Sequence, residues 1–203
     1  MLKHSFFSAI IIAFLALLAY QVEAAPTISP GTPTTSVPTY LTDGSYLFGI
    51  TVSLGTDEFL LPVEISGAAG LQNWQFDLLF DKTVVQEVDP GDGSSGIYGA
   101  EFTLGDLNSL SFILGGFPFN GLGEVDGVAG SYPSLLAGPS GDGPLAFIAF
   151  QFLTGQETNN PNFSIANASV LEAVPEPATL GLFIGGLLVL FGARRLAIYK
   201  RKT

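Results

Sequence analysis

Cysteine is absent from the 203-residue sequence, and histidine occurs once, as His4. The lack of cysteine excludes disulfides, thiol nucleophiles and cysteine-based zinc sites. His4 belongs to an N-terminal segment that we expect to be removed, so the mature chain cannot hold a Ser-His-Asp triad. A Ser-Lys dyad would need Lys82, which no motif surrounds, and carboxylates are too numerous to single out a glycosidase pair. We therefore expect a protein that is not an enzyme.

Positive charge is also scarce. The chain has seven Lys and Arg against 18 Asp and Glu, which gives a formal net charge of −11. Only Lys82 lies between the two apolar terminal segments, where nearly all the carboxylates are found. Such a field repels phosphate backbones and anionic lipid headgroups, so we exclude nucleic acid as a partner. The simplest role of the charge is solubility through self-repulsion.

The first 24 residues have the three parts of a signal peptide. Lys3 supplies a positive start, residues 6–20 are apolar, and Val22-Glu23-Ala24 places small residues where a signal peptidase reads. We expect a signal helix over residues 1–24, cleavage between Ala24 and Ala25, and export of the remaining chain.

The C-terminal segment predicts a membrane anchor. Residues 178–193 (ATLGLFIGGLLVLFGA) carry no charge, and the basic tail 194–203 comes directly after them. A single transmembrane helix of this length is slightly shorter than the usual minimum of about 17 residues, so it would need local thinning of the bilayer or snorkelling. Arg194 and Arg195 act as the stop-transfer signal and place the C-terminus in the cytoplasm. A buried core helix is the alternative for a stretch this short.

The order of parts in residues 174–203 resembles the PEP-CTERM sorting signal of Gram-negative bacteria. In that family a Pro-Glu-Pro triplet precedes a membrane helix and an arginine cluster, and the triplet here is Pro175-Glu176-Pro177. The resemblance implies that an exosortase-type processing protease reads the triplet. It also implies a transient anchor in the inner membrane, and then delivery to the cell surface or the extracellular matrix.

Between the terminal segments we expect a linker and one domain. Residues 25–39 (APTISPGTPTTSVPT) are rich in Pro, Thr and Ser without an apolar period, which predicts an extended, mobile linker. Residues 40–173 are enough for one buried core.

Alternation of apolar and polar residues with period two predicts strands throughout residues 40–173. The expected strands are Tyr46–Leu54, Phe59–Ile65, Trp74–Phe80, Thr83–Val88, Glu101–Leu104, Leu110–Phe117, Leu145–Leu153, Asn162–Ile165 and Ala168–Ala173. Asp81-Lys82 should join two of them as a hairpin, and Pro62 indicates a sheet edge or a bulge. No amphipathic helix longer than about two turns interrupts the strands. The sequence therefore predicts an all-β, antiparallel two-sheet sandwich between the two terminal helices.

Two stretches of this domain resemble cohesin-like domains, which are related to bacterial carbohydrate-binding modules. They are residues 70–81 (GLQNWQFDLLFD), with Val84, Val85 and Val88 after them, and residues 143–152 (GPLAFIAFQF), with residues 167–170 (NASV) near the end. The resemblance implies a nine-stranded jelly roll that docks a dockerin-like protein on one sheet face. The alternative is a carbohydrate-binding module for exopolysaccharide, and the sequence leaves both open.

Few residues suggest a binding site. Trp74 is in phase with the neighbouring phenylalanines, so we expect it in the core rather than on a sugar-binding surface. The aromatic residues expected in loops, and thus as exposed ligand contacts, are Tyr98, Phe117, Phe119 and Tyr132. Asp89 and Asp92 could bind calcium, although a plain Gly/Asp turn is the simpler interpretation because the spacing of a helix-loop-helix site is missing. We expect no other cofactor.

Overall fold

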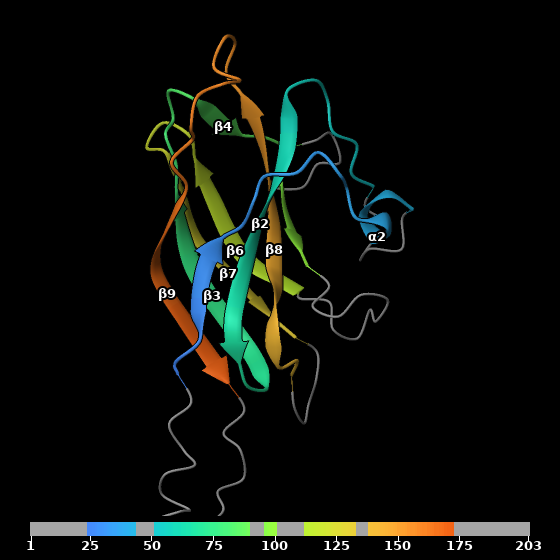
Figure 1. Cartoon of the computed structure of the whole chain (residues 1–203), viewed down its shortest axis with the longest axis vertical. Helices are drawn as coiled ribbons and strands as arrows, with labels where there is room; N and C mark the ends of the chain where they lie inside the picture. Colours follow the sequence, from blue (N-terminus) through green and yellow to red (C-terminus); the bar gives the residue numbers. More distant parts are fainter. Residues whose placement is uncertain (1–23, 44–50, 90–95, 101–111, 133–137, 173–203) are drawn as a thin grey trace, which may run out of the picture.

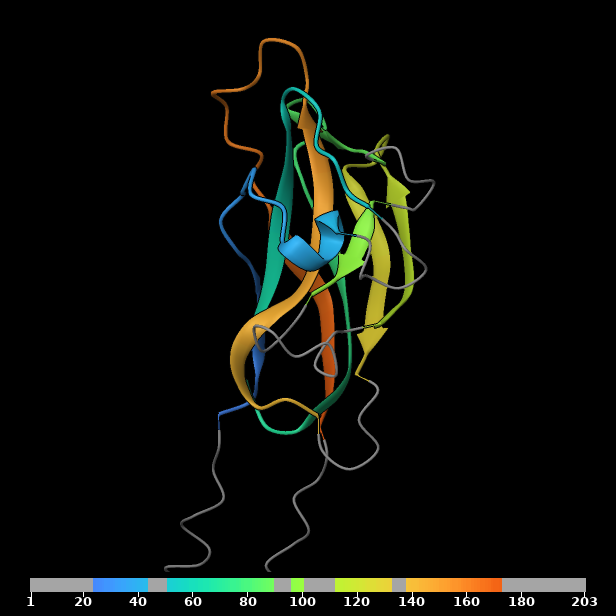
Figure 2. The ribbon, with the colours of Figure 1, turned by 90° about the vertical axis from the view of Figure 1, so that its right-hand side faces the viewer.

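The structure is a computed structural model, and it describes residues 24–43, 51–89, 96–100, 112–132 and 138–172. Within these residues nine strands form two antiparallel sheets that face each other (Figures 1 and 2). Sheet A has the order β1-β2-β8-β4, with β5 also paired to β8, and sheet B has the order β6-β7-β3-β9. The strands are β1 Thr27–Pro30, β2 Glu58–Ala68, β3 Leu71–Leu79, β4 Val85–Glu87, β5 Ile97–Gly99, β6 Phe112–Phe119, β7 Glu124–Ser131, β8 Gly141–Phe152 and β9 Ser164–Glu172. The predicted antiparallel sandwich is confirmed.

Both predicted terminal helices lie outside the described residues. The same holds for Pro175, Glu176, Pro177, Arg194, Arg195, Asp92 and the expected strand Glu101–Leu104. Ala24 and Ala25 are exposed and precede β1, and cleavage between them stays a prediction. The one helix in the described ranges is α2 (Thr39–Thr42), and none there is long and apolar enough to cross a bilayer.

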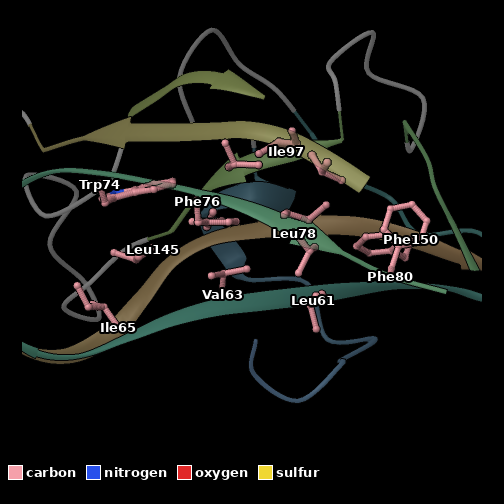
Figure 3. Close-up of a cluster of buried hydrophobic side chains, with 14 of the residues drawn as sticks. Leu61, Val63, Ile65, Trp74, Phe76, Leu78, Phe80, Ile97, Leu145 and Phe150 are labelled. Carbon is pink, nitrogen blue, oxygen red and sulfur yellow. The ribbon is translucent and has the colours of Figure 1, made fainter. Parts of the chain in front are cut away.

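The main core lies between the sheets. Side chains of β3 point from sheet B toward those of β2 and β8 in sheet A (Figure 3). Trp74 is 2 % exposed and stacks on Phe76 with ring centroids 5.5 Å apart, which confirms its predicted core position. Phe80 meets Phe150 edge-on, with centroids 5.1 Å apart.

Sheet A buries its outer face as well. Alternate residues of β2 are buried in the main core, namely Phe59, Leu61, Val63 and Ile65. Leu60, which lies between two of them on the other side of the strand, is also fully buried. Tyr40 and Leu41 of α2, together with Val52, pack over Leu60 and form a second apolar cluster. Val52 belongs to the expected strand Tyr46–Leu54, of which residues 51–54 are not in a strand and the rest is not described.

The predicted mobile linker is wrong for its central part. Thr27–Pro30 forms β1, which pairs with β2 in a register that sets Ile28 opposite Ile65, and Thr34 bridges to Leu60. The Thr- and Ser-rich composition suits an edge strand as well as a linker, and a proline is tolerated at an edge.

Pro62 marks a bulge but not a sheet edge. The register of β2 against β8 shifts between Val63 and Glu64, next to this proline. β2 lies between β1 and β8, so of the two predicted alternatives, an edge or a bulge, the bulge is the one present. The Pro62 carbonyl accepts a hydrogen bond from the Gly31 N–H at 2.8 Å, just where β1 has ended.

The expected hairpin from Trp74 to Val88 is also wrong, although the turn is present. The Asp81 Oδ1 accepts hydrogen bonds from the Thr83 N–H and hydroxyl, and the Val85 N–H donates to the Asp81 carbonyl at 3.1 Å. The two bonds from Thr83 lower the pKa of the Asp81 carboxyl, with the Thr83 hydroxyl contributing most. The turn carries the chain from sheet B into sheet A, so β4 pairs with β8 instead of β3.

Three further differences concern strands. β5 and β7 were not predicted, and the two segments expected at 162–165 and 168–173 form the single strand β9. β9 is irregular near Asn167, which has φ +48°, and its register against β3 shifts between Gln75 and Asp77. A residue in this left-handed conformation interrupts the alternation without ending the strand.

The two ends of the sandwich carry different parts of the chain. β1 begins and β9 ends at one end, which is the lower end in Figure 1. The turn between β6 and β7 lies at the other end, because β3 pairs with Glu172 at its start and with Glu124 at its finish.

Candidate functional site

The outer face of sheet B, which we call the open face, is the best candidate for a binding surface. The outer face of sheet A is covered by Tyr40, Leu41 and Val52, whereas no described segment covers sheet B in this way. Large apolar side chains are exposed on or beside sheet B. They are Leu79, Leu114, Phe117, Phe119, Leu122 and Leu171, with exposed fractions from 38 % to 72 %.

A shallow groove of about 230 Å³ crosses all four strands of sheet B. Its lining comprises Asn73, Trp74, Gln75, Leu114, Ala129, Gly130, Ser169, Val170 and Leu171. Leu114 on β6 and Leu171 on β9 are highly exposed, and they are far apart in the strand order. Asn73, Gln75 and Ser169 supply amide and hydroxyl groups to the same lining. The Trp74 ring is buried, so it offers no surface on which a sugar ring could stack.

An acidic cluster stands on β3 and β7, close to the groove along the sheet. Carboxylate oxygens of Asp77, Glu124 and Asp126 all lie within 4.8 Å of one another. Such oxygens can be balanced by a Lys or Arg of a partner or by a hard metal ion. Sequence reasoning missed this cluster because β7 was not predicted.

Local backbone geometry positions the cluster. Asp77 is 4 % exposed, its Oδ1 accepts from the Gly127 N–H at 2.8 Å, and its Oδ2 accepts from the Asn167 side-chain amide. The hydrogen bond from Gly127 is the main cause that lowers the pKa of Asp77, so this carboxylate is charged at neutral pH. Gly127 has φ +63° and Asn167 has φ +48°, which shows that both donors come from irregular points in their strands.

Of the four aromatic residues predicted as exposed ligand contacts, two are exposed and two are buried. Phe117 and Phe119 are 65 % and 44 % exposed, but they belong to the edge strand β6 and not to a loop. Tyr98 lies in β5 and is fully buried in the cluster beneath α2. Tyr132 is 5 % exposed, and its hydroxyl donates to the Pro144 carbonyl at 3.4 Å. The expectation that these two tyrosines are exposed was wrong, because each lies in or directly after a strand that was not recognised.

The other predicted site residues are not assembled into a site by the described part of the chain. Asp89 is exposed shortly after β4, and its expected companion Asp92 is not described. Glu87, which sequence reasoning did not consider, lies two residues before Asp89 and is buried.

Comparisons with known proteins gave structural matches only. No protein-family model and no curated protein matches the chain. A type II cohesin in a cohesin–X-dockerin complex from Acetivibrio cellulolyticus is similar at 14 % identity and a TM-score of 0.38, covering 61 % of this chain and 86 % of that one. A non-cellulosomal cohesin from the archaeon Archaeoglobus fulgidus matches at 14 % identity and a TM-score of 0.38, covering 57 % and 68 %. The third cohesin of a scaffoldin from Acetivibrio cellulolyticus, solved with a dockerin, matches at 14 % identity and a TM-score of 0.39, covering 57 % and 76 %. TM-scores this low do not establish a shared fold.

Proposed function

We propose that this protein is an exported, non-catalytic adhesion domain that docks another protein through the open face. One observation carries the proposal. The chain covers the outer face of sheet A with its own α2, while the outer face of sheet B presents a groove and exposed leucines. Exposed apolar side chains that gather on one face of a soluble domain are typical of a protein-binding surface.

The chemistry of the open face defines the partner. Leu114 and Leu171 offer apolar contacts on the two sides of the groove, and Asp77, Glu124 and Asp126 supply negative charge beside it. A complementary protein would present apolar side chains flanked by Lys or Arg. The cohesin-like motifs of the sequence support a dockerin-like module as this partner.

The test compares matched variants of the full-length chain. The double variant Leu114→Ser, Leu171→Ser should lose capture of a partner protein from the secretome of the producing cells. Both residues are exposed, so the fold should survive the change. The control variant is Leu122→Ser, because Leu122 is 72 % exposed but lies in the β6–β7 turn outside the groove. The docking proposal fails if the double variant and the control capture the same proteins as the wild type.

A polysaccharide is the second candidate ligand. The amides of Asn73 and Gln75 and the hydroxyl of Ser169 could donate to and accept from sugar hydroxyls, and Phe117 offers an exposed ring on β6. Retention on the cells' own exopolysaccharide, lost in Asn73→Ala and Phe117→Ala but kept in the leucine double variant, would favour this function over protein docking.

We also propose that the terminal segments sort the protein. Signal peptidase would cleave after Ala24, the segment 178–193 would hold the chain in the inner membrane, and an exosortase-type protease would act at Pro175-Glu176-Pro177. Replacing Glu176 by Ala should then leave the chain in the inner-membrane fraction. An unchanged yield at the cell surface would contradict the sorting proposal without affecting the docking proposal.

A further inference from the structure

Glu87 is a buried acid whose side chain lacks a hydrogen-bond partner. It is the last residue of β4, it is 7 % exposed, and its Oε1 has no donor within reach among the described residues. The backbone of Glu87 is fully engaged, because its N–H donates to the Asn120 Oδ1 at 2.7 Å and its carbonyl accepts from the Asn120 Nδ2 at 3.0 Å. A buried carboxylate oxygen without a hydrogen-bond partner costs free energy unless a proton or a cation compensates it.

A second carboxylate makes this cost larger. Asp89 lies two residues further along the chain, and its negative charge acts on Glu87. Burial, and after it the charge of Asp89, raise the pKa of Glu87 to about 7. Among the described residues, no positively charged side chain lowers the pKa of Glu87. The Lys82 ammonium group instead donates a hydrogen bond to the Gly121 carbonyl at 2.6 Å.

Backbone oxygen is available beside the Glu87 carboxylate. The Val88 carbonyl oxygen and the Glu87 Oε1 lie 2.1 and 2.5 Å from the position that a Cβ of residue 96 would take, so both oxygens lie beside the Gly96 backbone and close to each other. Residue 96 is a glycine with φ +67°, and any side chain there would collide with the two oxygens. Two oxygens of different kinds are thus brought together, and Asp89, directly after Val88, is exposed to the solvent from which a cation would come.

We propose that Glu87, the Val88 carbonyl and Asp89 bind a calcium ion beside Gly96. We call the site formed by these three residues the β4 seam. Hard cations prefer oxygen ligands, and calcium accepts irregular sets that mix carboxylates, carbonyls and water. The ion would satisfy the unpartnered Glu87 oxygen and cancel its repulsion with Asp89. With only two protein carboxylates, the dissociation constant should be on the order of 10⁻⁴ to 10⁻³ M, as in extracellular modules.

A carboxylate that belongs neither to the β4 seam nor to the acidic cluster of the open face gives a matched control. Glu64 is exposed on β2 of sheet A. Glu64→Gln removes one carboxylate, as Asp89→Asn does, but leaves the β4 seam intact. Because Asp89 is exposed, its substitution should not affect folding, while Glu87→Gln keeps the shape of the buried side chain.

The experiment is a titration of the full-length chain with CaCl₂ in detergent at pH 8 and constant ionic strength. We expect calorimetry to give one site in the range stated above, and the urea midpoint to rise with calcium in the wild type and in Glu64→Gln. Glu87→Gln and Asp89→Asn should each weaken binding at least tenfold and lose the rise. The proposal is overturned if the wild type binds no calcium, or if the two β4 seam variants bind it as tightly as the wild type.

Discussion

Glu87→Gln should change how the stability of the domain depends on pH. The pKa of Glu87 is about 7 in the folded chain, mainly because of burial, against 4.5 for an ordinary glutamate. Below pH 4.5 both the folded and the unfolded state hold the proton, so the full stability is present. Between pH 4.5 and 7 the unfolded state releases its proton first, and the free energy of unfolding falls as pH rises. Above pH 7 both states are ionised and the loss is complete.

The size of the stability loss depends on how far the pKa of Glu87 is raised by folding. One pKa unit corresponds to about 1.4 kcal/mol, so the wild type should lose about 3 kcal/mol between about pH 4.5 and about pH 8 through this group. Glutamine carries no charge at any of these pH values, so the variant should lack this loss. An amide donor left unpaired in the variant would cost free energy, but this penalty would not vary with pH. The informative quantity is therefore the slope of the difference between the two proteins.

Urea unfolding at several pH values across this range provides the assay, with a chelator present so that only protons compete for Glu87. Trp74 is the single tryptophan and is buried, so its fluorescence reports unfolding. The free energy of unfolding of Glu87→Gln minus that of the wild type should grow with pH by about 3 kcal/mol. A difference that stays constant across this range would refute the reasoning that burial holds the proton on Glu87.

Two further predictions concern side-chain packing and a pair of hydrogen bonds. Gly130→Ala should destabilise the domain by about 2 kcal/mol or more, because the new methyl group would stand 2.3 Å from the buried Trp74 ring, whereas Gly121→Ala, which meets nothing within 4 Å, should be nearly neutral. Thermal unfolding of the two variants checks this, and equal melting temperatures would contradict it. Asn120→Ala should cost about 2 kcal/mol, because it removes both bonds to the backbone of Glu87. Urea unfolding at about pH 5, where folded Glu87 stays neutral, measures this cost, and an unchanged midpoint would count against the role of Asn120.

The strands that the sequence predicts well are those with large apolar side chains on one face. β2, β3 and β8 form the centre of the core, so the alternation of residues such as Phe59 and Phe76 is clear in the sequence. β7 was missed because its residues are small. Gly130 cannot carry a side chain, since the Trp74 ring of the neighbouring strand fills that space. The reason for the glycine lies 56 positions away, and no local pattern reveals it.

Pairing of distant strands also limited the prediction of the site. The turn at Asp81 is a local feature and was found, but whether the chain continues in the same sheet depends on β8, which comes much later in the sequence. Asp77 alternates with Phe76 and Leu78 in the sequence, but its neighbours Glu124 and Asp126 are brought to it by the register of β7 against β3. The buried position of Glu87 likewise depends on the β6–β7 turn, through Asn120.

The chain enters β1 and leaves β9 at the same end of the sandwich, while the β6–β7 turn occupies the other (Figure 1). The nine residues of β3 connect the two ends, a length of about 30 Å. If either flank is fastened to an envelope, Leu122 at that turn projects roughly 30 Å beyond the point of attachment. The arrangement lets a bulky neighbour approach the tip without colliding with the supporting surface, and a short tether would suffice.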